Sequence, residues 1–258
     1  MTDEDTVLVE RKGAVALITL NRPKTRNAFN AGMRSRLLQA VEAVNADDNI
    51  RVCVLAGAGE GFCAGADLAE GISDSVTDQL ETEYKPFLMA IAECSKVWIS
   101  AVNGAAAGIG GALALTCDLV VMEEAASIYM AFAAIGLIPD GGATWQLLHG
   151  MGYHRAFETI VEGRRVAAHE CERLGLANRV VPVGKASGEA LSWAEELANG
   201  SPLAASAAKR VLRHVGRMRL QDAISLEAKV QQSLVETEDF RNAVAAFFDK
   251  RKPEFHGR

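Results

Sequence analysis

The chain has little basic charge, since 27 lysine and arginine residues stand against 33 acidic ones and the formal net charge is −6. The basic residues are scattered, so the sequence offers no concentrated positive surface for nucleic acid or an anionic membrane. The first residues, MTDEDTVLVERKG, have neither the basic start nor the apolar stretch of a signal peptide. We therefore expect a cytoplasmic protein that binds neither nucleic acid nor membrane.

Cysteine, metal-ligand spacings and long apolar runs are also scarce. The five cysteines are far apart and form no CxxC pair, so we expect reduced, mostly buried thiols. The five histidines show no spacing of a metal site, and we expect none. The most apolar stretch, Val97–Met122, is interrupted by Ser100, Asn103 and Asp118, which argues against a membrane span. The remaining composition, 49% hydrophobic and 23% charged, is typical of a globular protein.

Hydrophobic periodicity in the first 182 residues alternates between strands and helices. Apolar runs predict strands at Ala14–Leu20 and Arg51–Ala56, and helical spacing predicts a helix over Ala31–Val44 between them. The alternation continues with a helix over Thr77–Cys94, a strand over Val97–Val102 and a strand over Asp118–Met122. Short ββα units in this order predict an α/β fold in which the chain winds as a spiral.

After Pro182 the sequence predicts helices and almost no strands. The candidate helices cover Ala186–Ala198, Pro202–Gly216, Gln221–Val235 and Glu238–Arg251. Their apolar faces must bury against the spiral or against another copy of the chain, so we expect a homo-oligomer. We divide the chain into a spiral core over residues 1–182 and a helical C-terminal region over residues 183–258, which packs on the core and on neighbouring subunits.

Two glycine-rich loops, Gly57–Asp67 and Asn103–Ala112, each join a strand to a helix. Glycine allows close approach of the backbone to a ligand, and the first turn of a helix leaves N–H groups unpaired. Two such loops facing one point can bind an oxyanion, which suits the enolate of a thioester. A dinucleotide fingerprint at Gly57-x-Gly59-x-Gly61 is disfavoured because Phe62 stands where that motif needs Gly or Ala. The second loop, taken alone, is also compatible with simple close packing of a helix on a sheet.

Several motifs occur together in a characteristic order and spacing: Asn21-Arg-Pro-Lys-Thr-Arg-Asn-Ala28, Phe62-Cys-Ala-Gly-Ala-Asp67, Val102-Asn-Gly-Ala-Ala-Ala-Gly-Ile-Gly-Gly111 and Gly136-Leu-Ile-Pro139. In these motifs, and on through the C-terminal Phe247–Phe255, the chain resembles the crotonase (enoyl-CoA hydratase/isomerase) superfamily. The resemblance implies a crotonase-like spiral of ββα units with a C-terminal helical oligomerisation region. It also implies an acyl-CoA substrate, trimers or dimers of trimers, and no cofactor besides the coenzyme A of the thioester.

The resemblance also assigns site residues by position. The backbone N–H groups of Ala66 and Ile109 would form the oxyanion hole. The acyl pocket would be lined partly by Ile109, Phe132, Trp145 and the stretch Ala69–Leu80. Further positions that match coenzyme A or substrate contacts are Lys24, Arg26, Ala28, Ala64, Asp67, Leu68, Gly110, Phe247 and Lys250. The cations among them would pair with phosphates, or else are solvated surface charges.

The two glutamates with which hydratases of this family position water are missing. By position they fall on Ala112 and Phe132, and neither side chain can transfer a proton. A carboxylate remains at Asp140, where some isomerases of the family carry a working aspartate. A lone base beside an oxyanion hole suits a 1,3-proton shift, so we expect an enoyl-CoA isomerase that uses Asp140. Three alternatives stay open: hydration by a substitute carboxylate, a catalytically silent acyl-CoA-binding protein, and an Asp140 that only caps a helix.

Overall fold

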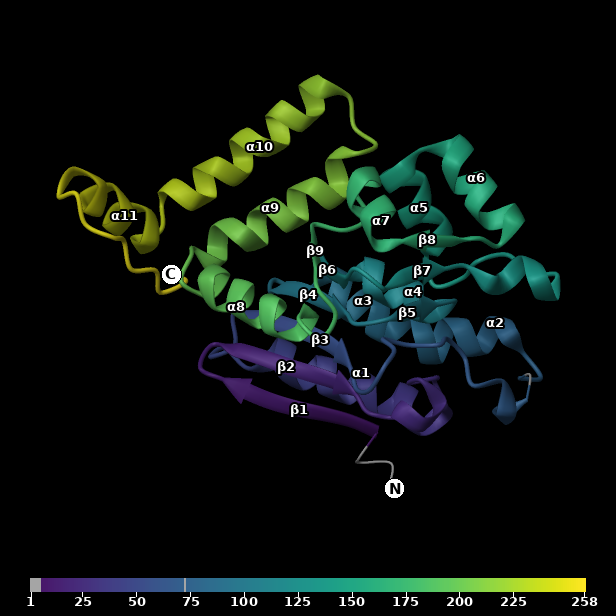
Figure 1. Cartoon of the computed structure of the whole chain (residues 1–258). Helices are drawn as coiled ribbons and strands as arrows, with labels where there is room; N and C mark the ends of the chain where they lie inside the picture. The colour runs from purple at the N-terminus through teal and green to yellow at the C-terminus, as the bar shows by residue number, and fades with distance from the viewer. Residues whose placement is uncertain (1–5, 72) are drawn as a thin grey trace.

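The computed structural model describes residues 6–71 and 73–258, and a six-stranded sheet lies at its centre (Figure 1). The remaining residues, 1–5 of the acidic N-terminus and Ile72 of the expected acyl-pocket wall, lie outside this description. In spatial order the strands are β1 (Val7–Lys12), β2 (Val15–Leu20), β3 (Val52–Gly57), β4 (Val97–Val102), β6 (Leu119–Glu123) and β9 (Arg179–Val181).

The pairing in this sheet is mostly parallel. Strands β1 and β2 form an antiparallel pair, and every later pair along the sheet is parallel. Parallel neighbours need a crossover segment between them. Here α1 (Ala31–Ala46) connects β2 to β3, α3 (Lys85–Glu93) precedes β4, and α4 (Ile109–Thr116) precedes β6. The strands and the first helix predicted from hydrophobic periodicity are thus confirmed to within two residues at most boundaries.

A second, smaller sheet contains β5 (Ala105–Ala107), β7 (Ser127–Tyr129) and β8 (Arg165–Ala167) in that order. Strand β5 lies inside the second glycine-rich loop and was not predicted, because three consecutive alanines show no alternation of polar and apolar residues. With it, β4, β5 and α4 form one strand–strand–helix unit. The crotonase-like α/β fold of ββα units is therefore confirmed.

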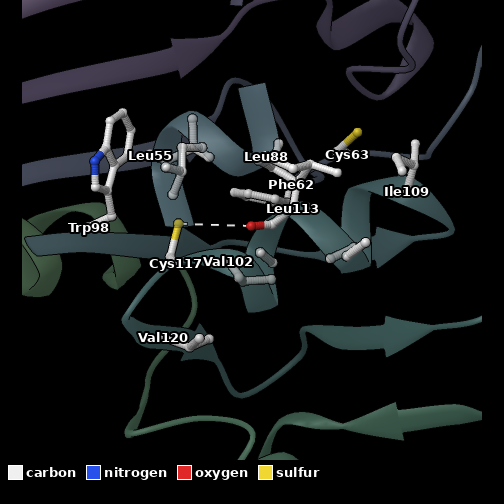
Figure 2. Packing of buried hydrophobic residues seen from close by; sticks show 14 of the residues in the cluster. Leu55, Phe62, Cys63, Leu88, Trp98, Val102, Ile109, Leu113, Cys117 and Val120 are labelled. Carbon is white, nitrogen blue, oxygen red and sulfur yellow. Dashed lines mark hydrogen bonds between the residues drawn. The ribbon is translucent and has the colours of Figure 1, made fainter. Parts of the chain in front are cut away.

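The large sheet is buried on both faces. Along β3, Cys53 and Leu55 belong to one hydrophobic cluster, whereas Val54 and Ala56 belong to another, as the two-residue period of a strand requires. Figure 2 shows Leu55 in the first cluster with residues of the first glycine loop and of α3 and α4. The second cluster is covered by α8 (Ala186–Ala198), whose alanines at intervals of four residues allow the helix to lie close to the strands.

All five cysteines are free, and four of them are buried, as expected from their spacing. Cys117 lies in the first cluster, where its thiol contacts the Leu113 carbonyl oxygen at 3.8 Å (Figure 2). Burial raises the pKa of this thiol, and it raises the pKa of Cys63 to about 12. These side chains therefore contribute to packing as small apolar groups.

The helix predicted over residues 77–94 is interrupted. Its parts are α2 (Val76–Gln79), a π-helical turn (Leu80–Tyr84) and α3. Pro86 has no N–H group with which to continue the regular hydrogen bonding of the preceding turn. The Lys85 N–H instead bonds to the Leu80 carbonyl, five residues earlier, which widens the helix there.

The remaining C-terminal helices extend away from the large sheet in Figure 1. They are α9 (Pro202–Val215), α10 (Leu220–Val235) and α11 (Glu238–Phe248), close to the predicted bounds. No residue of α10 is buried, and Leu220 on this helix and Phe247 on α11 are 77% and 78% exposed. Within the described chain, no helix combines the length and apolar character needed to cross a lipid bilayer.

Candidate active site

The first glycine-rich loop is held as an extra strand between two neighbours. On one side Cys63 pairs with β5, since its N–H bonds to the Ala105 carbonyl at 3.2 Å. On the other side the Phe29 N–H bonds to the Gly65 carbonyl at 2.7 Å, and the Asp67 N–H bonds to the Phe29 carbonyl at 2.9 Å. This parallel pairing uses the residues on either side of Ala66, so the Ala66 N–H points to the opposite side.

The second glycine-rich loop presents its own unpaired donor at the start of α4. Gly108 takes the N-cap position with a φ of 54°, and its carbonyl accepts from the N–H groups of Gly111 and Ala112. In residues 6–71 and 73–258, neither the Ile109 N–H nor the Ala66 N–H has a hydrogen-bond partner. Both residues line the same cavity of about 230 Å³. Two unpaired backbone donors thus border one pocket.

The two loops contact each other through glycine at a position where any side chain would collide. A Cβ on Gly110 would lie 2.6 Å from the Cys63 carbonyl oxygen and 2.7 Å from its sulfur. Gly110 therefore packs on the first loop and is not part of the pocket lining. The absence of a side chain at this position allows α4 to begin directly beside the first loop.

The Asn27 side chain holds the first loop through hydrogen bonds to its backbone carbonyls. This role was not predicted from the sequence. It is buried with a φ of 57°, a conformation that asparagine tolerates better than most residues. Its amide nitrogen donates to the carbonyls of Ala58 and Gly61 at 2.9 and 2.8 Å, and its amide oxygen accepts from the Arg22 N–H. One side chain therefore ties the segment before α1 to the loop that carries Ala66. Its place in the motif Asn21–Ala28 was the sequence feature that could have pointed to this role.

Asp140 contributes a partly buried carboxylate to the same pocket. Gly142 takes the N-cap position of α5 (Ala143–Met151), and no side chain caps this helix, so the cap interpretation of Asp140 is not supported. The Asp140 Oδ1 atom is buried without a hydrogen-bond partner in the described part of the chain. Burial raises the pKa of Asp140 to about 6, because the charged form is poorly solvated there.

The loop that carries Asp140 lies against the start of α4. A Cβ on Gly141 would be 2.2 Å from the Ile109 Cδ1 atom and 3.0 Å from the Ala112 Cβ atom. The residue that follows Asp140 thus packs directly against Ile109, the second backbone donor, and against Ala112. Among the pocket-lining residues that the structure describes, Asp140 is the only one with a carboxylate.

Three further predicted residues, Ala64, Leu68 and Phe132, line this pocket. The Phe132 ring lies 3.6 Å from the point where a Cβ on Gly108 would be, so it borders the end with the backbone donors. Asp67 does not line the cavity. Its carboxylate forms an ion pair with Arg22 at 2.9 Å, and both side chains are about 15% exposed or less. In this structure Asp67 anchors the loop.

The segment expected to bind the phosphates runs beside the first loop. The carbonyl of Arg26 accepts from the Ala64 N–H at 2.9 Å, and Ala28 is buried next to it. Lys24 and Arg26 are exposed, and neither forms an ion pair with any described residue. Two exposed cations, Lys24 and Arg26, thus lie in the segment that bonds to the pocket-lining Ala64.

Three of the predicted contacts are not brought to the pocket within one chain. Trp145 on α5 stacks on His149 with ring centroids 4.1 Å apart and lines a different cavity of about 720 Å³. Phe247 lies near the C-terminal end of α11 and Lys250 follows this helix, and both are exposed and outside the pocket lining. A metal site is likewise absent from the described residues, since no three His, Cys, Asp or Glu side chains are grouped to hold an ion.

Two unpaired backbone donors and one partly buried carboxylate on a single pocket define an enzyme class that stabilises an oxyanion while it moves a proton. The family comparison agrees with this class, because residues 10–258 match the family model described as Enoyl-CoA hydratase/isomerase. The chain belongs to the enoyl-CoA hydratase/isomerase (crotonase) family and is an acyl-CoA enzyme of that family.

Individual relatives span nearly the whole chain. A probable enoyl-CoA hydratase of Rhodobacter capsulatus is 39% identical, covering 98% of both chains. A 1,2-epoxyphenylacetyl-CoA isomerase of Escherichia coli is 34% identical, again covering 98% of each. An enoyl-CoA hydratase subunit crystal structure from Geobacillus kaustophilus superposes with a TM-score of 0.92 at 34% identity, covering 98% of each chain. Relatives of similar identity thus bear hydratase and isomerase names, so family membership leaves the reaction open.

Proposed function

We propose that this enzyme shifts the double bond of an enoyl-CoA by moving a proton with Asp140. The observation that carries the proposal is the Asp140 carboxylate itself, which borders the pocket and has one buried oxygen without a hydrogen-bond partner in the described chain. The raised pKa of about 6 suits a group that must both accept and release a proton near neutral pH. Ala112 and Phe132 supply no second acid at the positions where hydratases hold water.

The proposed reaction needs one base and the two backbone donors. Asp140 takes a proton from C2 of a 3-enoyl thioester, and the electron pair passes to the thioester oxygen as a dienolate. The N–H groups of Ala66 and Ile109 donate to that oxygen, and each well-placed donor stabilises such a transition state by about 2.7–4 kcal/mol. Protonated Asp140 then returns the proton to C4, and the double bond moves to C2–C3. Atoms and electrons balance without a further reactant.

Deuterium oxide distinguishes this reaction from hydration. When 3-enoyl-CoA and 2-enoyl-CoA are each followed by NMR in D₂O, we expect migration of the double bond, with deuterium entering at C2 and C4. A 2-enoyl-CoA converted to 3-hydroxyacyl-CoA without migration would assign the enzyme to the hydratases instead. Binding without any turnover on either thioester would contradict both reactions.

The pH dependence should follow the ionisation of Asp140. Because the base must be ionised and its pKa is raised to about 6, kcat/KM should rise between roughly pH 5 and 7 and then level off. Initial rates of double-bond migration with subsaturating thioester test this. A flat profile from pH 5 to 8 would show that no group with this pKa controls the reaction.

We also propose that the chain assembles as a homotrimer or a dimer of trimers through its C-terminal helices. The support is the amount of apolar surface left uncovered in one chain: Leu220 on α10 and Phe247 and Phe248 on α11 are each more than 75% exposed. Light scattering coupled to size-exclusion chromatography should give three or six times the mass of one chain. A single-chain mass over the micromolar range would refute the assembly.

A further inference from the structure

Tyr84 is a buried hydroxyl group on the same pocket as Asp140. Its side chain is 3% exposed, and both residues line the acyl pocket and an adjoining cavity of about 400 Å³. Burial raises the pKa of Tyr84 to about 12, and the negative charge of Asp140 adds to this rise. The phenol is therefore protonated at physiological pH and can donate its hydrogen to a ligand.

Three neighbours fix the position of the Tyr84 ring. Phe29 and Phe87 contact it edge-on, with ring centroids 5.9 and 6.0 Å away. The Arg34 guanidinium lies 5.3 Å from the ring centroid. Arg34 is itself held by an ion pair with Glu70 at 2.9 Å. Tyr84 also ends the π-helical turn, and such turns are frequent at functional sites.

The hydrogen of the Tyr84 hydroxyl has no acceptor among residues 6–71 and 73–258. The hydroxyl oxygen lies 3.5 Å from the Arg34 Nη1 atom, and a guanidinium has only donors, so Tyr84 must accept in that contact. No carbonyl or carboxylate of the described chain accepts from the phenol. A buried donor without a partner costs about 1–3 kcal/mol, which a bound ligand or water can offset.

We propose that the acyl pocket contains an oxygen site, at which the Tyr84 O–H donates to one oxygen atom beside the unpaired carboxylate oxygen of Asp140. Among the described residues the Tyr84 O–H has no acceptor and the buried Asp140 Oδ1 has no donor, and together they match a hydroxyl group or a water molecule in the space that both residues border. Much of the surrounding wall is apolar, through Leu80, Phe132 and Leu137, so the site selects where such an oxygen lies on the acyl group. This inference rests on the proposed function only in taking an acyl-CoA as the ligand.

The first test compares two ligands that differ by one hydroxyl group. Calorimetric titration of 3-hydroxybutyryl-CoA and butyryl-CoA should show about tenfold tighter binding of the hydroxylated thioester, the size expected for one well-placed hydrogen bond. In Tyr84→Phe the two affinities should become nearly equal, with the affinity for butyryl-CoA unchanged. An unchanged ratio in this variant, or no preference in the wild-type enzyme, overturns the proposal.

The second test identifies the source of the oxygen. With crotonyl-CoA in H₂¹⁸O, a bound water would add its oxygen to C3 and its proton to C2, and ¹⁸O would appear in the product. Loss of this label in Tyr84→Phe identifies water as the occupant. A retained ligand preference without any label identifies the hydroxyl group of the acyl chain. Label incorporation that is equal in both enzymes counts against a role for Tyr84.

The control is Tyr153→Phe, which removes an exposed phenol from α6 (Tyr153–Glu162), outside the pocket lining. It should leave ligand preference and label unchanged. Thermal unfolding of both variants shows whether they fold. The proposed proton shift has its own test, because an unaltered exchange rate in Asp140→Asn would reject it. The oxygen site and the proton shift can therefore be rejected separately.

Discussion

Asp140→Asn should lower kcat/KM for double-bond migration by about 10²–10⁴-fold, the usual contribution of a general base. Asparagine has nearly the same shape as aspartate but cannot accept the proton from C2. The pocket is otherwise unchanged, so the affinity for a saturated acyl-CoA should stay within about twofold of wild type. Deuterium exchange at the allylic carbon, measured by NMR, reports the chemical step directly, and an unchanged exchange rate would refute the mechanism.

The same variant should be more stable than wild type above pH 6. Burial raises the folded-state pKa of Asp140 from 3.8 to about 6, so the folded state holds the proton more tightly than the unfolded state does. The stability associated with that proton is complete below about pH 4 and is lost as the pH rises through 6. The asparagine side chain of the variant has no charge to bury, so the melting temperature of Asp140→Asn at pH 7.5 should exceed that of wild type. Asp48→Asn, an exposed position, is the matched control and should melt like wild type.

Gly110→Ala should cost at least about 100-fold in kcat/KM, although Gly110 does not line the pocket. The added methyl group would lie 2.6 Å from the Cys63 carbonyl oxygen, so the start of α4 and the first loop must separate. This displacement moves the Ile109 and Ala66 donors relative to each other, and loss of one such donor costs about 10²–10³-fold. Steady-state kinetics measure the effect of the displaced donors on catalysis, and urea unfolding measures the effect of the substitution on the stability of the fold.

The control for this variant is Gly188→Ala, which adds the same methyl group in α8. A Cβ there meets no atom within 4 Å. Alanine is also the better helix former, by about 0.5–1 kcal/mol. Gly188→Ala should therefore keep full activity and unfold at slightly higher urea concentration. Equal activity in Gly110→Ala would show that the close contact between the two loops is not needed for catalysis.

Much of the fold could be predicted from local patterns. Strand β3 is a continuous apolar run because both of its faces are buried, and α8 shows its contact face as alanines four residues apart. The two glycine-rich loops were visible because glycine is needed where backbones approach closely. Ala66, Ile109 and Asp140 were singled out by their place in motifs, and the structure brings all three to one cavity.

Other features depend on residues far apart in sequence and could not be predicted. Strand β5 pairs with β7, about twenty residues later, and its Ala105 and Ala107 also bond to Cys63, more than forty residues earlier. Asn27 acts through the carbonyls of a loop about thirty residues later. Trp145, assigned to the pocket by position, points to a separate cavity, because the direction of a side chain depends on the packing of its helix.

The sequence by itself determined the alternation of strands and helices and the two glycine-rich loops, since each of these is a property of residue type and spacing. Only the tertiary structure decided which side chains border the pocket and how they are buried and hydrogen-bonded. It buried one carboxylate oxygen of Asp140 without a partner among the described residues, raised the pKa of that group and placed the Tyr84 hydroxyl on the same pocket. Burial and the lack of a partner depend on which distant segments surround a group, and hydrophobic periodicity carries no information about that.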